Sequence, residues 1–115
     1  MEWQTTLGRP VSLEGVGLHS GKSCRLTLQP APADTGVRWQ RVDLDGQPIV
    51  PATVDCVAGT ERSTTLALGE ARIQTVEHVM AALAGMGVDN ALVQVDAPEP
   101  PVADGAAAVF ADLIR

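Results

Sequence analysis

No cluster of Lys and Arg occurs in this chain of 115 residues, and its net charge is −6. Proteins that bind nucleic acid without sequence preference neutralise a row of phosphates with basic side chains. Because the eight Lys and Arg residues are scattered, the composition excludes a general nucleic-acid partner. The sequence also has no apolar stretch of the roughly 20 residues that a helix needs to cross a bilayer, so we expect no membrane span.

Signals for export and for a disulfide framework are missing as well. The first four residues, MEWQ, have neither the positive charge nor the apolar stretch of a secretory signal, so we expect a cytoplasmic protein. The two cysteines, Cys24 and Cys56, lie far apart and form no CxxC pair. In a reducing compartment we expect both to be small buried apolar residues without a functional role.

The residues that are present indicate a single globular domain over 1–115. Apolar residues make up 45% of the chain and charged residues 19%, and a domain of this length buries roughly two thirds of the surface that it exposes when unfolded. The expected order of elements is several strands, a helix, a strand and a second helix. This order favours an α+β fold, a two-layer sandwich in which two helices pack on one face of a mainly antiparallel sheet.

The apolar pattern predicts the positions of these elements. Residues 24–28 alternate apolar and polar side chains, as a half-buried strand does, and residues 91–95 are nearly all apolar, which is typical of a central strand covered on one face by helices. Further strands are expected at 37–42 and at 63–68 with 71–73 (a hairpin around Gly69). Residues 49–57 have a mixed pattern, in which Pro51 suggests an edge position. A helix from Thr75 is expected to stop near Gly85 and Gly87, and Asp104 is expected to cap the last helix.

The segment GVGLHSGKS at residues 15–23 is similar to a phosphate-binding loop only at first sight. That loop has the pattern GxxxxGK[ST], but the position of its first glycine is occupied by Val16. Ser23 also leads into an expected strand rather than a helix. We therefore expect a tight glycine-rich turn between the first two strands, which presents His19 and Lys22.

Residues 75–78, TVEH, are expected to begin the first helix, with Thr75 as its N-cap. Adjacent residues lie about 100° apart around a helix, so Glu77 and His78 can face one cleft. An imidazole can ligate a metal while a neighbouring carboxylate acts as a general base. Alternatively, Glu77 only complements the helix dipole and His78 is a surface residue. The residues by themselves favour this second interpretation.

The number of metal ligands limits what the chain can do alone. A catalytic zinc ion usually takes three protein ligands and a water molecule, whereas this chain has two histidines and no HExxH pattern. Any metal site would therefore draw part of its ligands from elsewhere. The loop DAPEPPVADG at 96–105 contains three carboxylates, but we favour prolines that stiffen a crossover, with Asp104 as a helix cap, over a cation site.

Several segments together resemble the N-terminal domain of the bacterial UDP-3-O-acyl-N-acetylglucosamine deacetylase family. The matching stretches, in the family's order and spacing, are GVGLHSGK at 15–22, LTLQPAPADTG at 26–36, RVDL at 41–44, TVEHVMAALAG at 75–85, VDN at 88–90, DAPE at 96–99 and DG at 104–105. The resemblance covers nearly the whole chain. The sequence TVEH, followed by a helix of small residues, is its most specific part.

The resemblance implies a two-layer α+β fold used twice, with the active site between two similar domains that remove an N-acetyl group in lipid A synthesis. It assigns Glu77 as the general base and His78 as one of three zinc ligands, with ferrous iron as the alternative metal. The other two ligands, a His and an Asp, and a histidine general acid belong to the C-terminal catalytic domain, which this chain lacks. His19, Thr60 and Ser63 are implied near the substrate, UDP-3-O-acyl-N-acetylglucosamine.

Two stretches depart from the family pattern. Where the family has an Asp-Thr-x-x-Cys-Thr-like stretch at the mouth of the site, this chain has GTERST at 59–64, with charged Glu61 and Arg62 in place of typically apolar residues. The family's DGSA is DGAA at 104–107, which loses a hydroxyl group. The chain stops at Arg115, at the end of its expected last helix, so we interpret it as one domain or as a split or truncated gene product.

Two functional hypotheses follow. The first is the N-terminal half of a zinc-dependent deacetylase, inactive by itself. The second is a non-catalytic deacetylase-like module that binds a partner or forms a homodimer. Retention of Glu77 and His78 favours the first, while the missing half and the altered segment at 59–64 favour the second. In both, an apolar face around Ala81 and Ala82 would be uncovered, so we expect self-association that depends on concentration.

Overall fold

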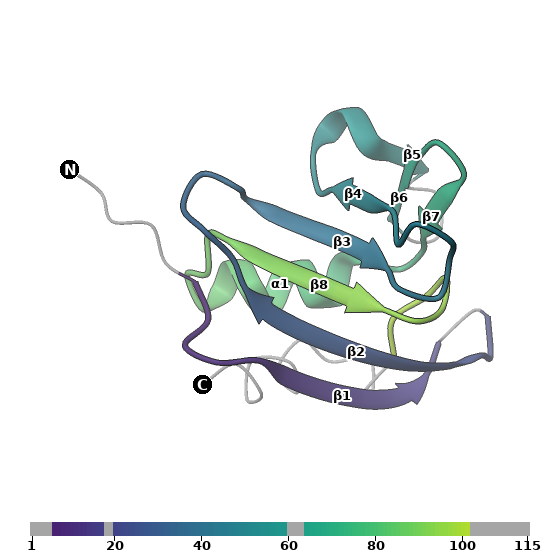
Figure 1. Cartoon of the computed structure of the whole chain (residues 1–115), viewed down its shortest axis with the longest axis horizontal. Coiled ribbons are helices and arrows are strands. Elements are labelled where there is room, and N and C mark those ends of the chain that lie inside the picture. The colour runs from purple at the N-terminus through teal and green to yellow at the C-terminus, as the bar shows by residue number, and fades with distance from the viewer. Residues whose placement is uncertain (1–5, 18–19, 60–63, 102–115) are drawn as a thin grey trace.

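The computed structural model describes residues 6–17, 20–59 and 64–101 (Figure 1). The elements are β1 (Val11–Val16), β2 (Ser23–Pro30), β3 (Val37–Arg41), β4 (Ile49–Pro51), the 3₁₀ helix η1 (Val54–Cys56), β5 (Val57–Gly59), β6 (Thr65–Leu68), β7 (Ala71–Ile73), α1 (Glu77–Gly85) and β8 (Ala91–Val95). The fold is α+β, as predicted. Of the two predicted helices, α1 is present, and the one after Asp104 lies outside the described residues.

The larger sheet has five strands in the order β1-β2-β8-β3-β4. All of its pairs are antiparallel except β3 with β8, which run parallel. The predicted central position of residues 91–95 is confirmed, because β8 is the third strand of five. The predicted edge position of Pro51 is also confirmed, since β4 ends the sheet and proline cannot donate to a further ladder.

A smaller sheet of three strands, in the order β5-β6-β7, was not predicted as a separate unit. Its β6–β7 hairpin was predicted, and it turns at Gly69 with a φ of 61°. The segment 49–57, which has a mixed pattern, changes sheet: the chain leaves β4 after Pro51 and turns through η1 before β5 begins. A short local pattern does not reveal such a change of sheet.

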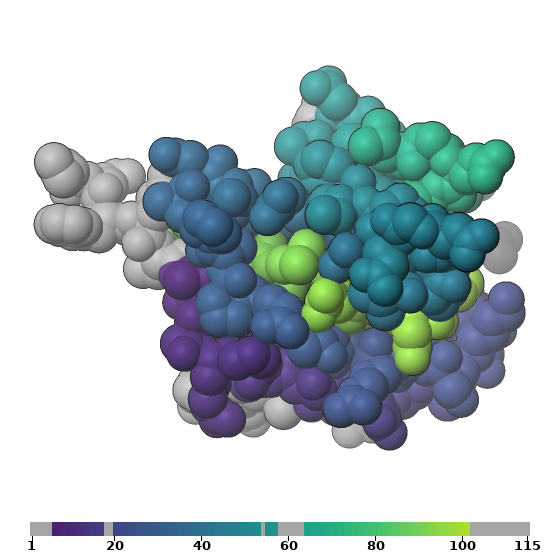
Figure 2. Space-filling model, viewed as in Figure 1, coloured from purple at the N-terminus to yellow at the C-terminus, as the bar shows by residue number. Residues whose placement is uncertain are grey.

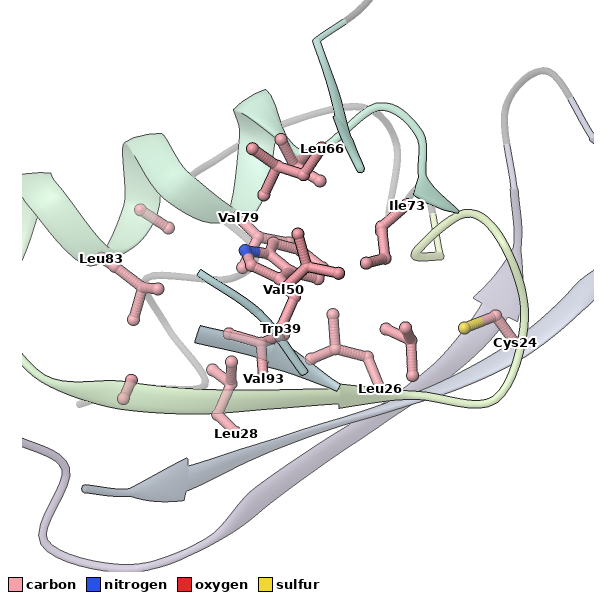
Figure 3. Packing of buried hydrophobic residues seen from close by; sticks show 14 of the residues in the cluster. Cys24, Leu26, Leu28, Trp39, Val50, Leu66, Ile73, Val79, Leu83 and Val93 are labelled. Carbon is pink, nitrogen blue, oxygen red and sulfur yellow. The ribbon is translucent and has the colours of Figure 1, made fainter. Parts of the chain in front are cut away.

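The hydrophobic core lies between the larger sheet and α1 (Figure 3). Trp39 on β3 is fully buried at the centre of the view, near Val50 of β4 and Val79 of α1. Its indole Nε1 donates a hydrogen bond of 3.5 Å to the sulfur of Met80, so the polar atom of this large side chain has a partner inside the core. Burial of the apolar face of α1, which includes Val79, against the sheet holds this helix in place.

On the opposite face of the larger sheet, which is turned toward the viewer in Figure 2, most side chains are polar and are half-buried or exposed. Three glutamines form a ladder across β2, β8 and β3: Gln29 Nε2 donates to Gln94 Oε1 (3.2 Å), and Gln94 Nε2 donates to Gln40 Oε1 (3.0 Å). Along β8, buried residues alternate with the half-buried Leu92 and Gln94. One covered face and one solvated face are typical of a two-layer fold.

Both cysteines are free and buried, as predicted. Burial raises the pKa of the Cys24 thiol to about 12. A thiol with such a pKa is almost never ionised near neutral pH and is therefore a poor nucleophile and metal ligand. Cys24 acts as an apolar core residue.

The buried side chain of Arg41 connects the two sheets and also forms an ion pair with Asp43, an exposed residue. Arg41 at the end of β3 donates to both carboxylate oxygens of Asp43, at 2.9 Å from Nε and 2.7 Å from Nη2, and its Nη1 donates to the carbonyl of Arg72 on β7 at 2.9 Å. The hydrogen bonds from Arg41 lower the pKa of the Asp43 carboxyl. Arg41 and Asp43 of the RVDL segment therefore have a structural role.

The prediction that Ala81 and Ala82 share an exposed flank was wrong for Ala82. Ala82 is only 3% exposed and belongs to the core, because it lies on the same side of α1 as Val79 and Leu83. Ala81 is exposed, as is Ala84 one turn further on. Over the described residues, no helix is both long and apolar enough to span a membrane.

Candidate functional site

The helix with the Glu-His pair begins one residue later than predicted. α1 begins at Glu77, Val76 is its N-cap, and no side chain caps the helix. Thr75, the predicted N-cap, turns its hydroxyl away from the helix and donates to Oε2 of Glu99 instead. The prediction was wrong because a buried carboxylate, distant in sequence, accepts the hydrogen bond from the Thr75 hydroxyl.

The backbone at Thr75 is unusual. Its φ is 57°, in the left-handed region that β-branched residues rarely adopt. The backbone N–H groups of both neighbouring residues make long-range hydrogen bonds: Gln74 N donates to Pro98 O at 2.7 Å, and Val76 N donates to Thr64 O at 3.2 Å. Residues in this region cost roughly 1–3 kcal/mol and persist where the surroundings fix them, often at functional sites.

Glu77 is held at the helix start by its own side chain. Its Oε1 accepts a hydrogen bond of 3.1 Å from the backbone N–H of Thr64. Since Val76 N donates to the carbonyl of the same Thr64, the chain before β6 is fixed to the helix start at two points. Glu77 is half-buried and lies at the positive end of the helix dipole.

His78 is the next residue of the helix and is half-buried. An imidazole in this position remains accessible to a ligand. No group of three or more His, Cys, Asp or Glu residues that could hold a metal ion occurs within 6–17, 20–59 and 64–101. Within these residues the donor set does not form a complete metal site.

The glycine-rich segment forms a turn, as predicted. β1 and β2 are antiparallel with Val16 opposite Ser23, and Gly17 N donates to the carbonyl of Lys22 at 3.0 Å. The backbone N–H of Ser20 points inward and donates to Oε1 of Glu99 at 2.8 Å. The turn is thus attached to the same carboxylate as Thr75.

The loop after β8 contains a buried residue that sequence reasoning missed. Glu99 is 0% exposed, while Asp96 is exposed and accepts a hydrogen bond of 2.8 Å from the backbone N–H of Arg25. The two carboxylates thus make separate contacts, which supports a crossover loop, and Asp104 lies outside the described residues. The available signal was a single Glu set between prolines, in a loop whose Pro100 and Pro101 are buried.

Several predicted site residues cannot be placed with the pair. His19, Thr60 and Ser63 lie outside the described residues, as do Glu61 and Arg62. Two surface hollows of about 540 and 580 Å³ are lined by other parts of the chain, around Cys24 and around Leu68. Glu77 and His78 line neither of them.

Comparison with known proteins gives a consistent result. Residues 4–115 match the family model described as LpxC, UDP-3-O-acyl N-acetylglycosamine deacetylase. A UDP-3-O-acyl-N-acetylglucosamine deacetylase of Anaeromyxobacter sp. (strain Fw109-5) is 58% identical over 97% of this chain and 36% of its own length. One from Cellvibrio japonicus is 49% identical over 97% of this chain and 37% of its own length.

A longer relative shows the same relation. The bifunctional enzyme LpxC/FabZ of Porphyromonas gingivalis is 46% identical over 100% of this chain, which covers 25% of that protein. The chain therefore spans about a third of the length of the deacetylases that it matches. With a match from residue 4 to residue 115, the chain belongs to the UDP-3-O-acyl N-acetylglycosamine deacetylase (LpxC) family.

Proposed function

We propose that this chain is the N-terminal part of a zinc-dependent UDP-3-O-acyl-N-acetylglucosamine deacetylase, inactive alone, in which Glu77 is the general base and His78 one metal ligand. The observation that carries the proposal is the helix start, where a carboxylate fixed by Thr64 stands beside an accessible imidazole. Family membership supplies the reaction, hydrolysis of an acetamide. The remaining ligands, a His and an Asp, would come from a second domain.

The proposed role of Glu77 follows from its geometry. One oxygen accepts the Thr64 N–H at 3.1 Å, which fixes the position of the carboxylate and leaves its second oxygen for another contact. Such a carboxylate takes the proton from water as the water attacks the acetamide carbonyl carbon. The C–N bond then breaks, acetate leaves, and the amine takes a proton from a general acid outside this chain.

His78 would hold the metal ion together with the missing ligands. When bound, a zinc ion or a ferrous ion lowers the pKa of water and polarises the carbonyl of the substrate. The imidazole follows the Glu77 carboxylate along the helix, about 100° around its axis. The general base and the metal ligand can therefore face the same cleft. This chain contributes one ligand and cannot complete the site.

A direct test is release of acetate from UDP-3-O-acyl-N-acetylglucosamine. The chain is assayed alone, and again after mixing with a separately expressed C-terminal domain of the Anaeromyxobacter relative. We expect no acetate from either part alone and measurable turnover from the mixture. Turnover by this chain alone would contradict the shared site, and no turnover from a mixture that forms a complex by sedimentation would contradict the proposed function.

A further inference from the structure

The Glu99 carboxylate connects three segments that are far apart in sequence. It lies in the loop after β8, accepts a hydrogen bond from Ser20 N in the glycine-rich turn, and accepts another from the Thr75 hydroxyl before α1. The sequence separations are 79 and 24 residues. Its side chain is 0% exposed, so no substrate reaches it, and Glu99 is not a catalytic residue.

A carboxylate in the interior is costly unless its hydrogen bonds are made. A mere stiffening of the loop would not require one, because buried prolines already lie at positions 100 and 101. What the carboxylate does contact is the residue with the strained backbone, Thr75, with φ at 57°. Glu99 thus holds Thr75 in a backbone conformation that a threonine rarely adopts.

The direction of α1 depends on that conformation. A rotation about φ of Thr75 turns everything that follows, and Glu77 and His78 come two and three residues later. The loop that carries Glu99 also binds the backbone of the preceding residue, because Gln74 N donates to Pro98 O at 2.7 Å. One loop therefore fixes the side chain of Thr75 and the backbone N–H of Gln74.

We infer that Glu99 is a positioning residue: through Thr75 it sets the direction of the Glu77–His78 pair, and through Ser20 it holds the glycine-rich turn to the same point. The positioning itself is a property of this chain, and its effect on turnover rests on the proposed function. Two isosteric variants separate the contact of Glu99 with Thr75 from its contact with Ser20. Glu99→Gln weakens both hydrogen bonds, and Thr75→Val removes only the hydroxyl while keeping the β-branched shape.

The first arm of the test is NMR of the whole chain. In Glu99→Gln we expect the Thr75 Cα and Cβ shifts to leave their left-handed values and the amide signals of Ser20, Glu77 and His78 to move. In Thr75→Val we expect the Glu77 and His78 signals to move while the Ser20 amide stays. The control Glu70→Gln, in the exposed turn between β6 and β7, should leave all of these signals in place.

The second arm is turnover in the mixture with the C-terminal domain. We expect kcat to fall at least tenfold in Glu99→Gln, with KM within twofold of the wild type. The double variant Glu99→Gln with Thr75→Val should be no worse than the poorer single variant. Thr75→Ser, which keeps the hydroxyl, should restore the kcat that Thr75→Val loses. Unmoved Glu77 and His78 signals, or an unchanged kcat despite moved signals, would overturn the inference. If Glu99→Gln does not fold, Thr75→Val decides. An inactive wild-type mixture contradicts the proposed function, and the NMR arm still decides on the positioning.

Discussion

Replacing Glu77 by glutamine is expected to lower kcat of the assembled deacetylase roughly 100- to 10,000-fold, the usual effect of losing a general base. Glutamine keeps the size of the side chain and an oxygen that accepts the Thr64 N–H, which the carboxylate accepts at 3.1 Å. The helix start should therefore keep its place. What is lost is the capacity to take a proton from the attacking water. The measurement is acetate release under saturating substrate, with KM determined beside kcat.

The control for Glu77→Gln is Glu70→Gln, the same chemical change at an exposed turn. We expect this control to be indistinguishable from the wild type. Urea unfolding should show that both variants keep the stability of the parent chain within about 1 kcal/mol. A Glu77→Gln enzyme that retains more than a third of the wild-type kcat would rule out the carboxylate as the general base.

Gly17→Ala is expected to have the largest effect on stability among the glycine substitutions. A Cβ at this position would lie 2.5 Å from Oγ of Ser20, closer still to Oε1 of Glu99, and 3.1 Å from Cβ of Glu99. Relief of this overlap would push the turn away from a buried carboxylate and weaken the hydrogen bond from Ser20 N. We expect the free energy of unfolding to fall by about 2–4 kcal/mol, from overpacking and a poorly satisfied buried group.

A matched control for Gly17→Ala is Gly85→Ala at the end of α1. A Cβ there meets nothing within 4 Å, and alanine is the better helix former by roughly 0.5–1 kcal/mol. This variant should be neutral or slightly stabilising in urea unfolding. Equal stabilities for the two variants would mean that the turn is not packed against Glu99 as described.

Local features of the fold were predictable from sequence because local chemistry determines them. The apolar run at 91–95 predicted the central strand, and the proline at position 51 predicted an edge. Gly69 predicted a hairpin turn that needs a positive φ. Apolar residues at i, i+3, i+4 and i+7, which are Val76, Val79, Met80 and Leu83, predict the face of the helix that packs on the core. Three of these four are at most 1% exposed, and Met80 is half-buried.

Long-range features were not predictable in this way. The break between β4 and β5 puts neighbouring residues in different sheets, and their mixed local pattern does not reveal it. Thr75 has the sequence features of an N-cap, but its hydroxyl is bound by a residue 24 positions away. The exposure expected for Ala82 was wrong because Ala82 lies on the buried side of α1 with Val79 and Leu83.

In the candidate site, too, only the local features were predictable from the sequence. The physical properties of an adjacent Glu and His predicted a pair that could face one cleft, but they favoured an ordinary helix start. Only the resemblance over several segments pointed to a general base and a metal ligand. The structure adds the parts that no local pattern contains, which are the Thr64 N–H on Glu77 and the buried Glu99 behind Thr75.

The central claim is that this chain holds one ligand of a zinc site that a second domain completes. Titration calorimetry with zinc tests it most directly, for the wild type and for His78→Ala, each with and without the separately expressed C-terminal domain. We predict tight binding only for the wild type with the second domain present, and loss of that binding in His78→Ala. Tight binding by the chain alone, or binding in the mixture that His78→Ala leaves unchanged, would contradict the claim.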